Sequence, residues 1–414
     1  MKKFYLLTIW MLLLSGTVMA QEGRPGGSHR GMPPGGHHNQ KREGSLSTTG
    51  IGLTSGEQHK KNETYTSDGA DENAVLVKGG TLTLESCHIQ KKGSDSSSSD
   101  ATSFYGINSA VLATNQGTVN LKGGEITTSA LGANGIVAYG GVVNVEGTTI
   151  RCEKNLSRGI HATGGGTINA KNLNIDTKGN NSSVIATDRG GGTVNVEGGT
   201  YKCSGKDCAV CYSTGDITLR NIEGLSEQGE VAVIEGDNEA NIIDCQMTSG
   251  DSRRGMLILQ SGSGDAEGRN GRINITGGSL TLTSPEAPLI EITTSTKGTL
   301  TLKDVKLDVP SGVLMLVDYN KRWRTTNPVA TLNLQTDSRA TYNGDIKVDE
   351  YGTSTVVIDK NVTWNGAYDV AGTGKQTTVI VSGVWNMTED SNVHNVIIKE
   401  GGVINRNGHQ LTTK

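Results

Sequence analysis

Residues 190–200 read GGGTVNVEGGT, a short alternating run with glycines on both sides. Val194 and Val196 alternate with polar neighbours, which is the pattern of a β-strand with one buried face. The glycines of a phosphate-binding loop lie between a strand and the N-terminus of a helix. Here a strand follows the first glycines and no stretch of the chain keeps a helical period. We therefore interpret the glycines as corners between strands.

A four-residue pattern similar to TVNV recurs along the chain, and we call each copy a word. Positions two and four of each word are aliphatic, whereas positions one and three are mostly Thr and Asn. Successive words start 23 to 37 residues apart, a spacing typical of proteins in which each repeat is one turn of a solenoid. Besides TVNV at Thr193, the words start at Thr81, Thr118, Val142, Thr167, Asp216, Glu239, Arg272, Thr299, Thr331, Thr355 and Thr378.

Each repeat contains two further apolar segments. One lies eight residues after the start of most words, at Ile89, Ile126, Ile150, Ile175, Tyr201, Met247, Leu280 and Leu307. The other precedes the next word, as in GIVA at Gly135, GIHA at Gly159, SVIA at Ser183 and AVIE at Ala232. Three short strands per coil predict an all-β fold, a right-handed parallel β-helix (solenoid) of about twelve coils, because parallel crossovers are almost always right-handed. With about 4.8 Å between stacked strands, the rod is about 55 to 60 Å long.

The N-terminus differs from the repeats. Residues 1–20 combine two lysines, an apolar run and a small-x-small ending, which predicts a cleavable signal peptide. Residues 21–72 are rich in Gly, Pro and His and predict a flexible leader, in which three histidines (His29, His37, His38) lack a rigid scaffold for a metal. We assign residues 73–414 to the β-helix, with a C-terminal cap from about 360. The longer intervals predict loops at 91–106, 260–271 and 318–327.

Composition and charge exclude several kinds of partner. The formal net charge of −4 leaves no extended basic face, so we expect no nucleic-acid partner. The apolar run of the signal, about 15 residues, is shorter than the roughly 20 that span a bilayer, and no other such run follows. We therefore expect no transmembrane segment after signal cleavage. No motif indicates a cofactor or a metal site, and we predict neither.

Two columns of polar residues follow from stacking the words. The third position is Asn or Thr in ten of the twelve words, and stacked amides hydrogen-bond along a rod. The fifth position alternates in charge over six words, and opposite charges on neighbouring strands stabilise the register. We expect both columns to be chiefly structural; the charged one consists of Glu85, Lys122, Glu146, Lys171, Glu197 and Arg220.

Three consecutive words have a charged residue in place of Thr at position one. These residues are Asp216, Glu239 and Arg272. Two carboxylates one coil apart, beside an arginine, suit acid–base chemistry on a sugar or Ca²⁺ binding. The chain lacks the Asp pair and Gly-His-Gly of a polygalacturonase, and no convergent Lys, Arg and Asp set of the pectate-lyase kind is evident. We keep the three residues as catalytic candidates, with a solvated charged face as the alternative.

Six cysteines occur in the repeat region. Cys152 and Cys203 share an inward position two coils apart, roughly 9.6 Å, which exceeds the Cα separation of about 7 Å that a disulfide allows. Cys203 and Cys208 form a candidate disulfide in an oxidising compartment, with buried thiols as the alternative. A zinc site of Cys203, Cys208 and Cys211 lacks a fourth ligand. The remaining two are Cys87 and Cys245.

The C-terminal stretch GVWNMTEDSNVHNVIIKEGGVINRNG, residues 383–408, resembles the end of autotransporter passenger domains. There a Trp, a Thr, an acidic turn with Ser and a Val-rich strand close a right-handed β-helix; the matching positions are Trp385, Thr388, Ser391, Val393 and Val396. Upstream words such as ATGGGTINA look like those of adhesin-like β-helix proteins of bacterial surfaces. The resemblance covers roughly residues 70 to 410 and implies an exported protein of the extracellular space, cell surface or periplasm.

This chain also departs from that family, because it reaches Lys414 without the alternating strands of about ten residues that a membrane barrel needs. We therefore expect no C-terminal β-barrel in these residues. We interpret Trp364 and Trp385 as capping the rod, with ligand binding as the alternative.

The leading hypothesis is a secreted or surface-exposed, non-enzymatic, adhesin-like β-helix. A surface glycan or a protein ligand would contact its long face and its loops. The alternative is a carbohydrate-active β-helix enzyme, a polysaccharide lyase or glycoside hydrolase, that uses Asp216, Glu239 and Arg272.

Overall fold

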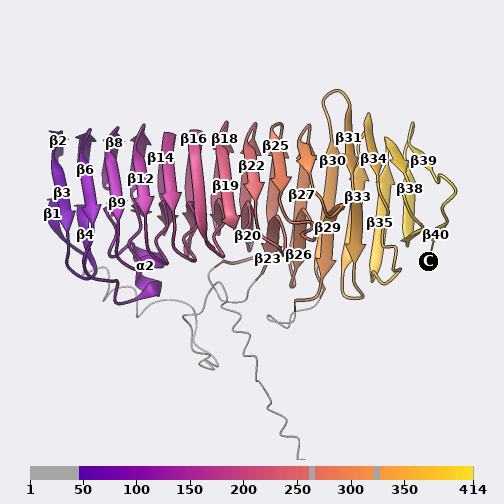
Figure 1. Ribbon diagram of the computed structural model, residues 1–414, viewed down its shortest axis with the longest axis horizontal. Helices are drawn as coiled ribbons and strands as arrows, with labels where there is room; N and C mark the ends of the chain where they lie inside the picture. The colour runs from indigo at the N-terminus through magenta and orange to yellow at the C-terminus, as the bar shows by residue number, and fades with distance from the viewer. Residues whose placement is uncertain (1–45, 261–265, 321–326, 414) are drawn as a thin grey trace, which may run out of the picture.

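A computed structural model describes residues 46–260, 266–320 and 327–413, which wind into a parallel β-solenoid of about 15 turns (Figure 1). Strand accounts for 56% of the described residues and helix for 2%, so a helical fold is excluded for them. The predicted signal peptide, its cleavage site and the leader up to residue 45, including its three histidines, lie outside the described residues.

Three walls of parallel strands surround the core. Wall 1 is a 12-stranded sheet in the described residues. Its strands are β1 (Ser47–Leu53), β4 (Glu72–Val77), β7 (Val111–Thr114), β10 (Ile136–Tyr139), β13 (Ile160–Thr163), β15 (Ile185–Thr187), β17 (Cys211–Ser213), β20 (Ala232–Glu235), β23 (Met256–Leu259), β26 (Ile290–Thr293), β29 (Val313–Asp318) and β32 (Asp345–Val348). Two short strands, β37 (Ser391–Val393) and β40 (Leu411–Thr413), pair with each other in the last turns.

Wall 2 contains the repeated words. Its strands are β2 (Glu57–Lys61), β5 (Thr81–Glu85), β8 (Thr118–Lys122), β11 (Val142–Glu146), β14 (Gly166–Thr177), β16 (Gly192–Lys206), β18 (Asp216–Arg220), β21 (Glu239–Ile243), β24 (Arg272–Thr276), β27 (Lys297–Lys303), β30 (Val329–Gln335), β33 (Thr353–Ile358), β35 (Gln376–Val381) and β38 (Asn395–Ile398). The strands β14 and β16 continue around the corner, so their second halves belong to wall 3.

Wall 3 is made in two parts. The first part consists of β3 (Thr64–Ser67), β6 (His88–Lys91), β9 (Glu125–Thr128), β12 (Thr149–Cys152), the second halves of β14 and β16, β19 (Glu223–Gln228), β22 (Gln246–Ser249), β25 (Ser279–Leu282) and β28 (Lys306–Asp308). The second is a separate four-stranded sheet of β31 (Ala340–Asn343), β34 (Val362–Asn365), β36 (Val384–Asn386) and β39 (Val403–Asn405).

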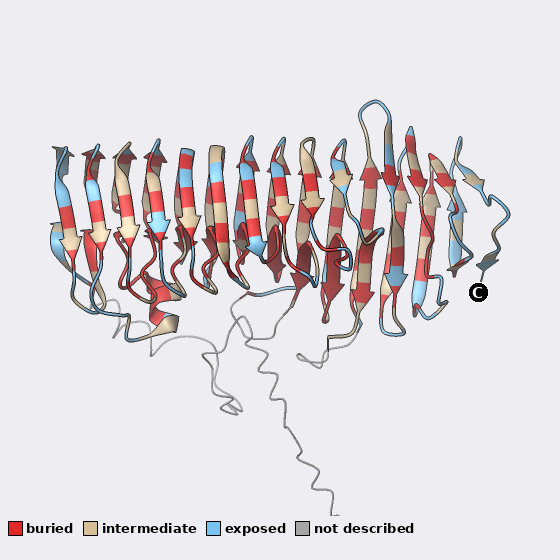
Figure 2. Cartoon of the chain, in the orientation of Figure 1, coloured by how far each residue is buried: buried red, intermediate tan, exposed pale blue. Residues whose placement is uncertain are grey.

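The register confirms the predicted repeat. Each word start pairs with the start of the next word in wall 2, as Thr193 does with Thr167 before it and Asp216 after it. Positions two and four point inward and are buried, which gives the alternating bands along the strands in Figure 2. The words predicted the strands because an inward aliphatic residue at every second position is what a half-buried strand requires.

The glycines after TVNVE form the corner between walls 2 and 3. Gly198 and Gly199 have φ angles of 65° and 100°, a region that side chains rarely adopt. A Cβ on Gly199 would lie 2.2 Å from the Leu173 carbonyl oxygen of the preceding coil. These glycines are therefore corners, and the phosphate-loop alternative is excluded.

The rod begins earlier than we predicted and has more coils. Strands β1, β2 and β3 lie within residues 47–67, which we assigned to the flexible leader, and pair with β4, β5 and β6. We missed β2 because Gln58 and Lys60 occupy its inward positions opposite Leu82 and Leu84. A terminal coil has core on one side only, so these polar residues stay solvated. At the other end, β38 adds a coil after the last predicted word.

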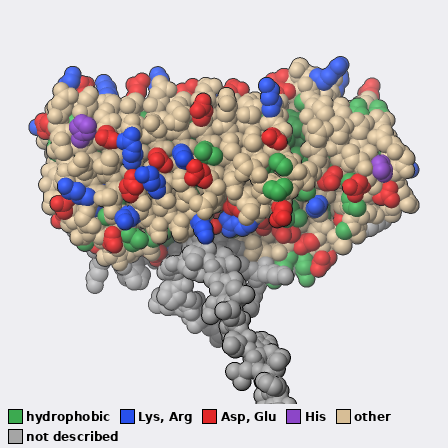
Figure 3. All heavy atoms as spheres, in the orientation of Figure 1, with side chains coloured by type: hydrophobic (Ala, Val, Ile, Leu, Met, Phe, Trp, Pro, Cys, Tyr) green, Lys and Arg blue, Asp and Glu red, His purple; other side chains and the backbone are tan. Residues whose placement is uncertain are grey.

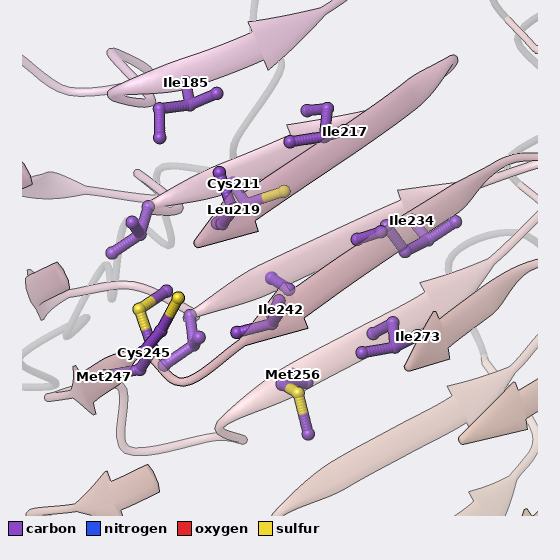
Figure 4. Close-up of a cluster of buried hydrophobic side chains, with 14 of the residues drawn as sticks. Ile185, Cys211, Ile217, Leu219, Ile234, Ile242, Cys245, Met247, Met256 and Ile273 are labelled. Carbon is purple, nitrogen blue, oxygen red and sulfur yellow. The ribbon is translucent and has the colours of Figure 1, made fainter. Parts of the chain in front are cut away.

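Inward side chains of all three walls fill the interior. Figure 4 shows Leu219 and Ile242, register partners on β18 and β21, beside the buried Cys245 at the next corner. From coil to coil the inward positions are mostly apolar and belong to one cluster of buried residues, so the core is one continuous stack.

Aromatic residues replace the aliphatic stack in the second part of wall 3. Trp364 and Trp385 are register partners, fully buried and stacked with ring centroids 5.1 Å apart. Each indole N–H donates to a backbone carbonyl, of Gly344 and Gly366 respectively. The ligand alternative for these tryptophans is therefore wrong. The coils continue beyond residue 360 with the same parallel pairing as those before it.

Candidate functional site

The outer face of wall 1 is covered at its N-terminal end. The predicted loop at 91–106 contains a short helix, α2 (Ser99–Tyr105), which begins at the N-cap Ser98 and ends at Gly106 in the left-handed conformation. Phe104 and Tyr105 pack on Leu112 and other outward apolar residues of the first coils. This part of wall 1 is an internal packing surface and does not face solvent.

A buried polar cluster fixes this helix to wall 1. His161 is fully buried, and its Nε2 lies 2.7 Å from the carbonyl oxygen of Ser103. Arg158 donates to the Ser103 hydroxyl and forms an ion pair with Asp188 at 3.1 Å. Burial, reinforced by the nearby Arg158, lowers the pKa of His161 well below its usual value. The imidazole is therefore neutral and acts as a structural donor.

Farther along wall 1, one arginine connects three coils. The Arg254 guanidinium lies 3.0 Å from a Glu230 carboxylate oxygen and 2.6 Å from one of Glu291. Their side chains are only 16%, 6% and 10% exposed. Burial raises the pKa of Glu230 against the opposing effect of Arg254, whereas the two carboxylates raise the pKa of Arg254 against its burial. The cluster is a buried ion network, which locks three coils together.

Asp318 at the end of β29 is a second carboxyl group of this region with a raised pKa. Burial, with the neighbouring charges of Glu291 and Asp349, raises its pKa to about 7. Its Oδ1 is buried and has no hydrogen-bond partner among the described residues. Sequence reasoning missed Asp318 and Glu291, because a single carboxylate on an outward position gives no sign that the position is covered.

The outer face of wall 2, unlike that of wall 1, consists of polar side chains that are partly or fully exposed. Its third-position amides form a ladder in which each side-chain N–H donates to the oxygen of the previous coil. Asn144 donates to Asn120 at 2.9 Å, Asn169 to Asn144 at 3.0 Å and Asn195 to Asn169 at 3.0 Å. The ladder starts at the hydroxyl of Thr83, which accepts from Asn120 at 3.3 Å. The predicted stack of amides is therefore present.

The charged column runs beside this ladder. Its members pair in register as predicted, with Lys122 4.0 Å from Glu85 and Lys171 3.7 Å from Glu146. The lysines are 63% and 59% exposed, so each pair contributes little to stability. These charges remain available to a ligand.

The two columns border a shallow groove of about 360 Å³ that crosses β5, β8, β11 and β14. Its walls are outward side chains, and its floor includes the inward-facing positions Leu121 and Val145 between the columns. The lining residues are Thr83, Asn120, Leu121, Lys122, Asn144, Val145, Glu146, Asn169 and Lys171. Sequence analysis supplied the columns but not the groove, which needs the coils to be placed in space.

A second groove, of about 560 Å³, marks the junction between the two parts of wall 3. Strand β28 pairs with β25, and β31 pairs with β34, but the sheets that contain β28 and β31 are separate. Leu307 at this junction is only partly buried and packs against the core.

The structure brings the three catalytic candidates together but gives them a structural arrangement. Asp216, Glu239 and Arg272 occupy one register position on three successive coils. Arg272 binds one oxygen of Glu239 at 2.7 Å, and the Asn241 amide donates to the other at 2.6 Å. The hydrogen bond from Arg272 lowers the pKa of Glu239, which opposes a general-acid role.

All six cysteines are buried free thiols. Cys203 donates to the Cys208 carbonyl at 3.3 Å, and Cys208 donates to the Gly179 carbonyl at 3.1 Å. Burial raises the pKa of Cys208 to about 12 and also that of Cys211 to about 12, so neither is a ready thiolate. The Cys203–Cys208 disulfide stays a prediction for oxidising conditions.

Within the described ranges, no three His, Cys, Asp or Glu side chains are grouped to hold a metal ion. No helix in the same ranges is long and apolar enough to cross a membrane. On the face drawn in Figure 3, positive and negative side chains are interspersed over the rod.

The stacked words and parallel walls define a parallel β-helix protein, and a weak sequence similarity makes it autotransporter-passenger-like. In sequence the chain is similar to the BrkA autotransporter of Bordetella pertussis, strain Tohama I, with 24% identity over 302 residues. The match covers 69% of this chain and 26% of that protein, so this chain spans about a quarter of its relative's length. No family model and no solved structure matches the chain.

Proposed function

We propose that this chain is an exported, surface-exposed, adhesin-like rod that binds other molecules through the outer face of wall 2. The observation that carries the proposal is the contrast between two faces of one rod. Wall 1 is covered by its own helix and holds buried ion networks, whereas wall 2 presents polar columns and a groove to solvent. Similarity to an autotransporter supports an exported location.

The enzymatic alternative has less support. Glu239 has both carboxylate oxygens occupied and a lowered pKa, so it suits a structural ladder better than proton transfer. Turnover assays on acidic and neutral polysaccharides, with Asp216→Ala and Glu239→Ala as variants, separate the two functions. We expect no turnover; hydrolysis or elimination abolished by both substitutions would overturn the non-enzymatic proposal.

Binding of the labelled full chain to bacterial and epithelial cells, measured by flow cytometry, tests the proposal. The informative variant changes Lys122 and Lys171 to Glu, which reverses two charges at the groove. The matched control changes Lys202, on wall 3, and Lys178, directly after the wall 3 half of β14, to Glu; each of these lysines also has one exposed carboxylate partner. We expect the first variant to lose binding and the second to keep it. Equal binding by the two variants, or no binding to any cell, would contradict the proposal.

A further inference from the structure

We propose that the groove of wall 2 binds an extended, uncharged polysaccharide that lies along the rod axis. This inference rests on the proposed function and names the ligand class for the same face. Three features of the groove carry it: its shape, its free hydrogen-bonding groups and its balance of charge.

The shape follows from strand geometry. The ladder and the charged column occupy positions three and five, so they stand about 7 Å apart across the strands. Position four points inward and leaves a channel between them. The same channel repeats on neighbouring coils in register, so it runs along the rod and crosses the strands. A long, thin ligand fits this channel better than a compact one.

The hydrogen-bonding groups repeat with the coils. A primary amide has two N–H donors and an oxygen that accepts twice. Asn120 and Asn144 each use one donor and one acceptor in the ladder. Each therefore keeps one donor and one acceptor for a ligand, once per coil, at about 4.8 Å intervals. A chain of sugar units supplies hydroxyls that both donate and accept at regular intervals, which is the matching chemistry.

The charges favour a ligand without net charge. The groove itself is lined by two lysines, Lys122 and Lys171, and one carboxylate, Glu146. Glu85, the next member of the charged column, lies 4.0 Å from Lys122, so these four charges sum to zero, and their signs alternate from coil to coil. A polyanion that lies along the groove meets a carboxylate at every second coil, and a polycation meets a lysine. An uncharged chain avoids both repulsions and can still accept from the lysines and donate to the carboxylates.

The lining residues include no aromatic side chain, so sugar rings have no stacking platform there. Hydrogen bonds to neutral groups contribute modestly when they replace bonds to water. Each coil therefore adds little, and binding depends on contacts repeated over several coils. We expect long polysaccharides to bind and short oligosaccharides of the same sugar to compete poorly.

Affinity electrophoresis of the full chain tests the inference. Native gels contain hydroxyethylcellulose, a β-1,3-glucan or an α-mannan as uncharged probes, and polygalacturonate as the polyanionic probe. We expect at least one uncharged probe to retard the chain and polygalacturonate to have no effect. Asn144→Ala interrupts the ladder inside the groove and is expected to weaken retardation about tenfold.

Asn386→Ala is the matched control. Asn386 also donates to one ladder amide, Asn365, and accepts from another, Asn405, but it lies on wall 3 outside the groove. We expect this variant to keep the affinity of the unmodified chain, and thermal unfolding checks that both variants remain folded. Equal weakening by both substitutions, or retardation by polygalacturonate alone, would overturn the inference.

The two proposals fail in distinguishable ways. Cell binding without retardation by any uncharged probe overturns the polysaccharide inference and leaves the surface-binding function standing. Absence of both cell binding and retardation overturns both. Retardation that is lost in Asn144→Ala, together with cell binding lost in the same variant, supports both.

Discussion

The outer faces of walls 1 and 2 belong to the same coils but differ in almost every respect. On wall 1, outward residues such as Leu112, His161 and Glu291 are buried, and the residues change from coil to coil. On wall 2, outward positions repeat Thr, Asn and alternating charges, and stay partly or fully exposed. Substitutions on wall 1 should therefore affect stability, whereas substitutions on wall 2 should affect binding.

The largest effect on stability is expected for Arg254→Ala. The substitution removes the Arg254 partner of the buried Glu291 and leaves the buried Glu230 only its longer contact with Arg253, at 3.7 Å. Breaking a buried ion pair costs about 3 to 5 kcal/mol of unfolding free energy. Denaturant unfolding measures the loss. Arg151→Ala serves as the control, because Arg151 pairs with Glu125 at an exposed position, and it should cost under about 1 kcal/mol. Similar losses of unfolding free energy in the two variants would contradict the account, because the buried ion network of wall 1 would then stabilise the fold no more than an exposed ion pair.

A pH-dependent loss is expected from His161 on the same wall. Its pKa is lowered in the folded chain, so below about pH 6.5 the unfolded chain binds a proton that the folded chain rejects. The contribution of His161 to stability is thus fully present above the unfolded pKa and falls as the pH drops below it, by up to about 1.4 kcal/mol per pH unit. Asp318, whose pKa is raised to about 7, contributes with the opposite sign, so the difference between the unmodified chain and a His161 variant isolates the contribution of His161. Unfolding between pH 7.5 and 5.5 measures this slope.

His161→Gln provides the comparison, because the amide N–H can still donate to Ser103 and does not titrate. Between those pH values, the free energy of unfolding of this variant should lack the pH dependence that one titrating histidine contributes. An unchanged slope would mean that His161 is not the titrating group.

A smaller effect is expected within the ladder of wall 2. Asn169→Ala removes one bond to Asn144 and one from Asn195, at an exposed site where water replaces both. The expected cost is about 1 kcal/mol, measured by denaturant unfolding. A loss above about 3 kcal/mol would mean that the ladder is a main source of stability, contrary to the contrast between the walls.

The smallest effect is expected for Lys171→Ala in the charged column. Both partners of its ion pair are about 60% exposed, so the free energy of unfolding should change by less than about 0.5 kcal/mol. Binding to cells by the same variant should nevertheless fall. A variant that loses stability but keeps binding would reverse the roles assigned to the two walls.

Wall 2 could be predicted from the sequence in detail, because each coil repeats the same pattern. The words starting at Thr118, Val142 and Thr167 gave the strands, the register and both polar columns. Periodicity carries this information since every inward position meets the same neighbours in the adjacent coils. Periodicity failed at Lys60 in β2, because no coil precedes β2 among the described residues and a charge is tolerated there at an inward position.

Wall 1 could be predicted only as strands. Whether its outward residues are buried depends on which distant segment of the chain packs on them. The sequence around His161 or Arg254 does not indicate that such a segment exists. The sequence-based candidates Asp216, Glu239 and Arg272 share one register position on successive coils, and Arg272 donates to Glu239. A catalytic role for them stays a prediction. The groove also escaped prediction, because it arises from coils stacked in space.

The most direct test of whether wall 2 is the binding face is chemical acetylation of the lysines. The chain is acetylated once alone and once while it is bound to cells or polysaccharide, and mass spectrometry measures the acetylation of each lysine. Lys122 and Lys171 at the groove are 63% and 59% exposed, and Lys178 and Lys202, on or directly after a strand of wall 3, are 49% and 45% exposed. We predict that bound cells or polysaccharide protect the first pair and leave the second pair unchanged. Protection of Lys178 and Lys202 alone, or equal labelling of all four, would contradict the account.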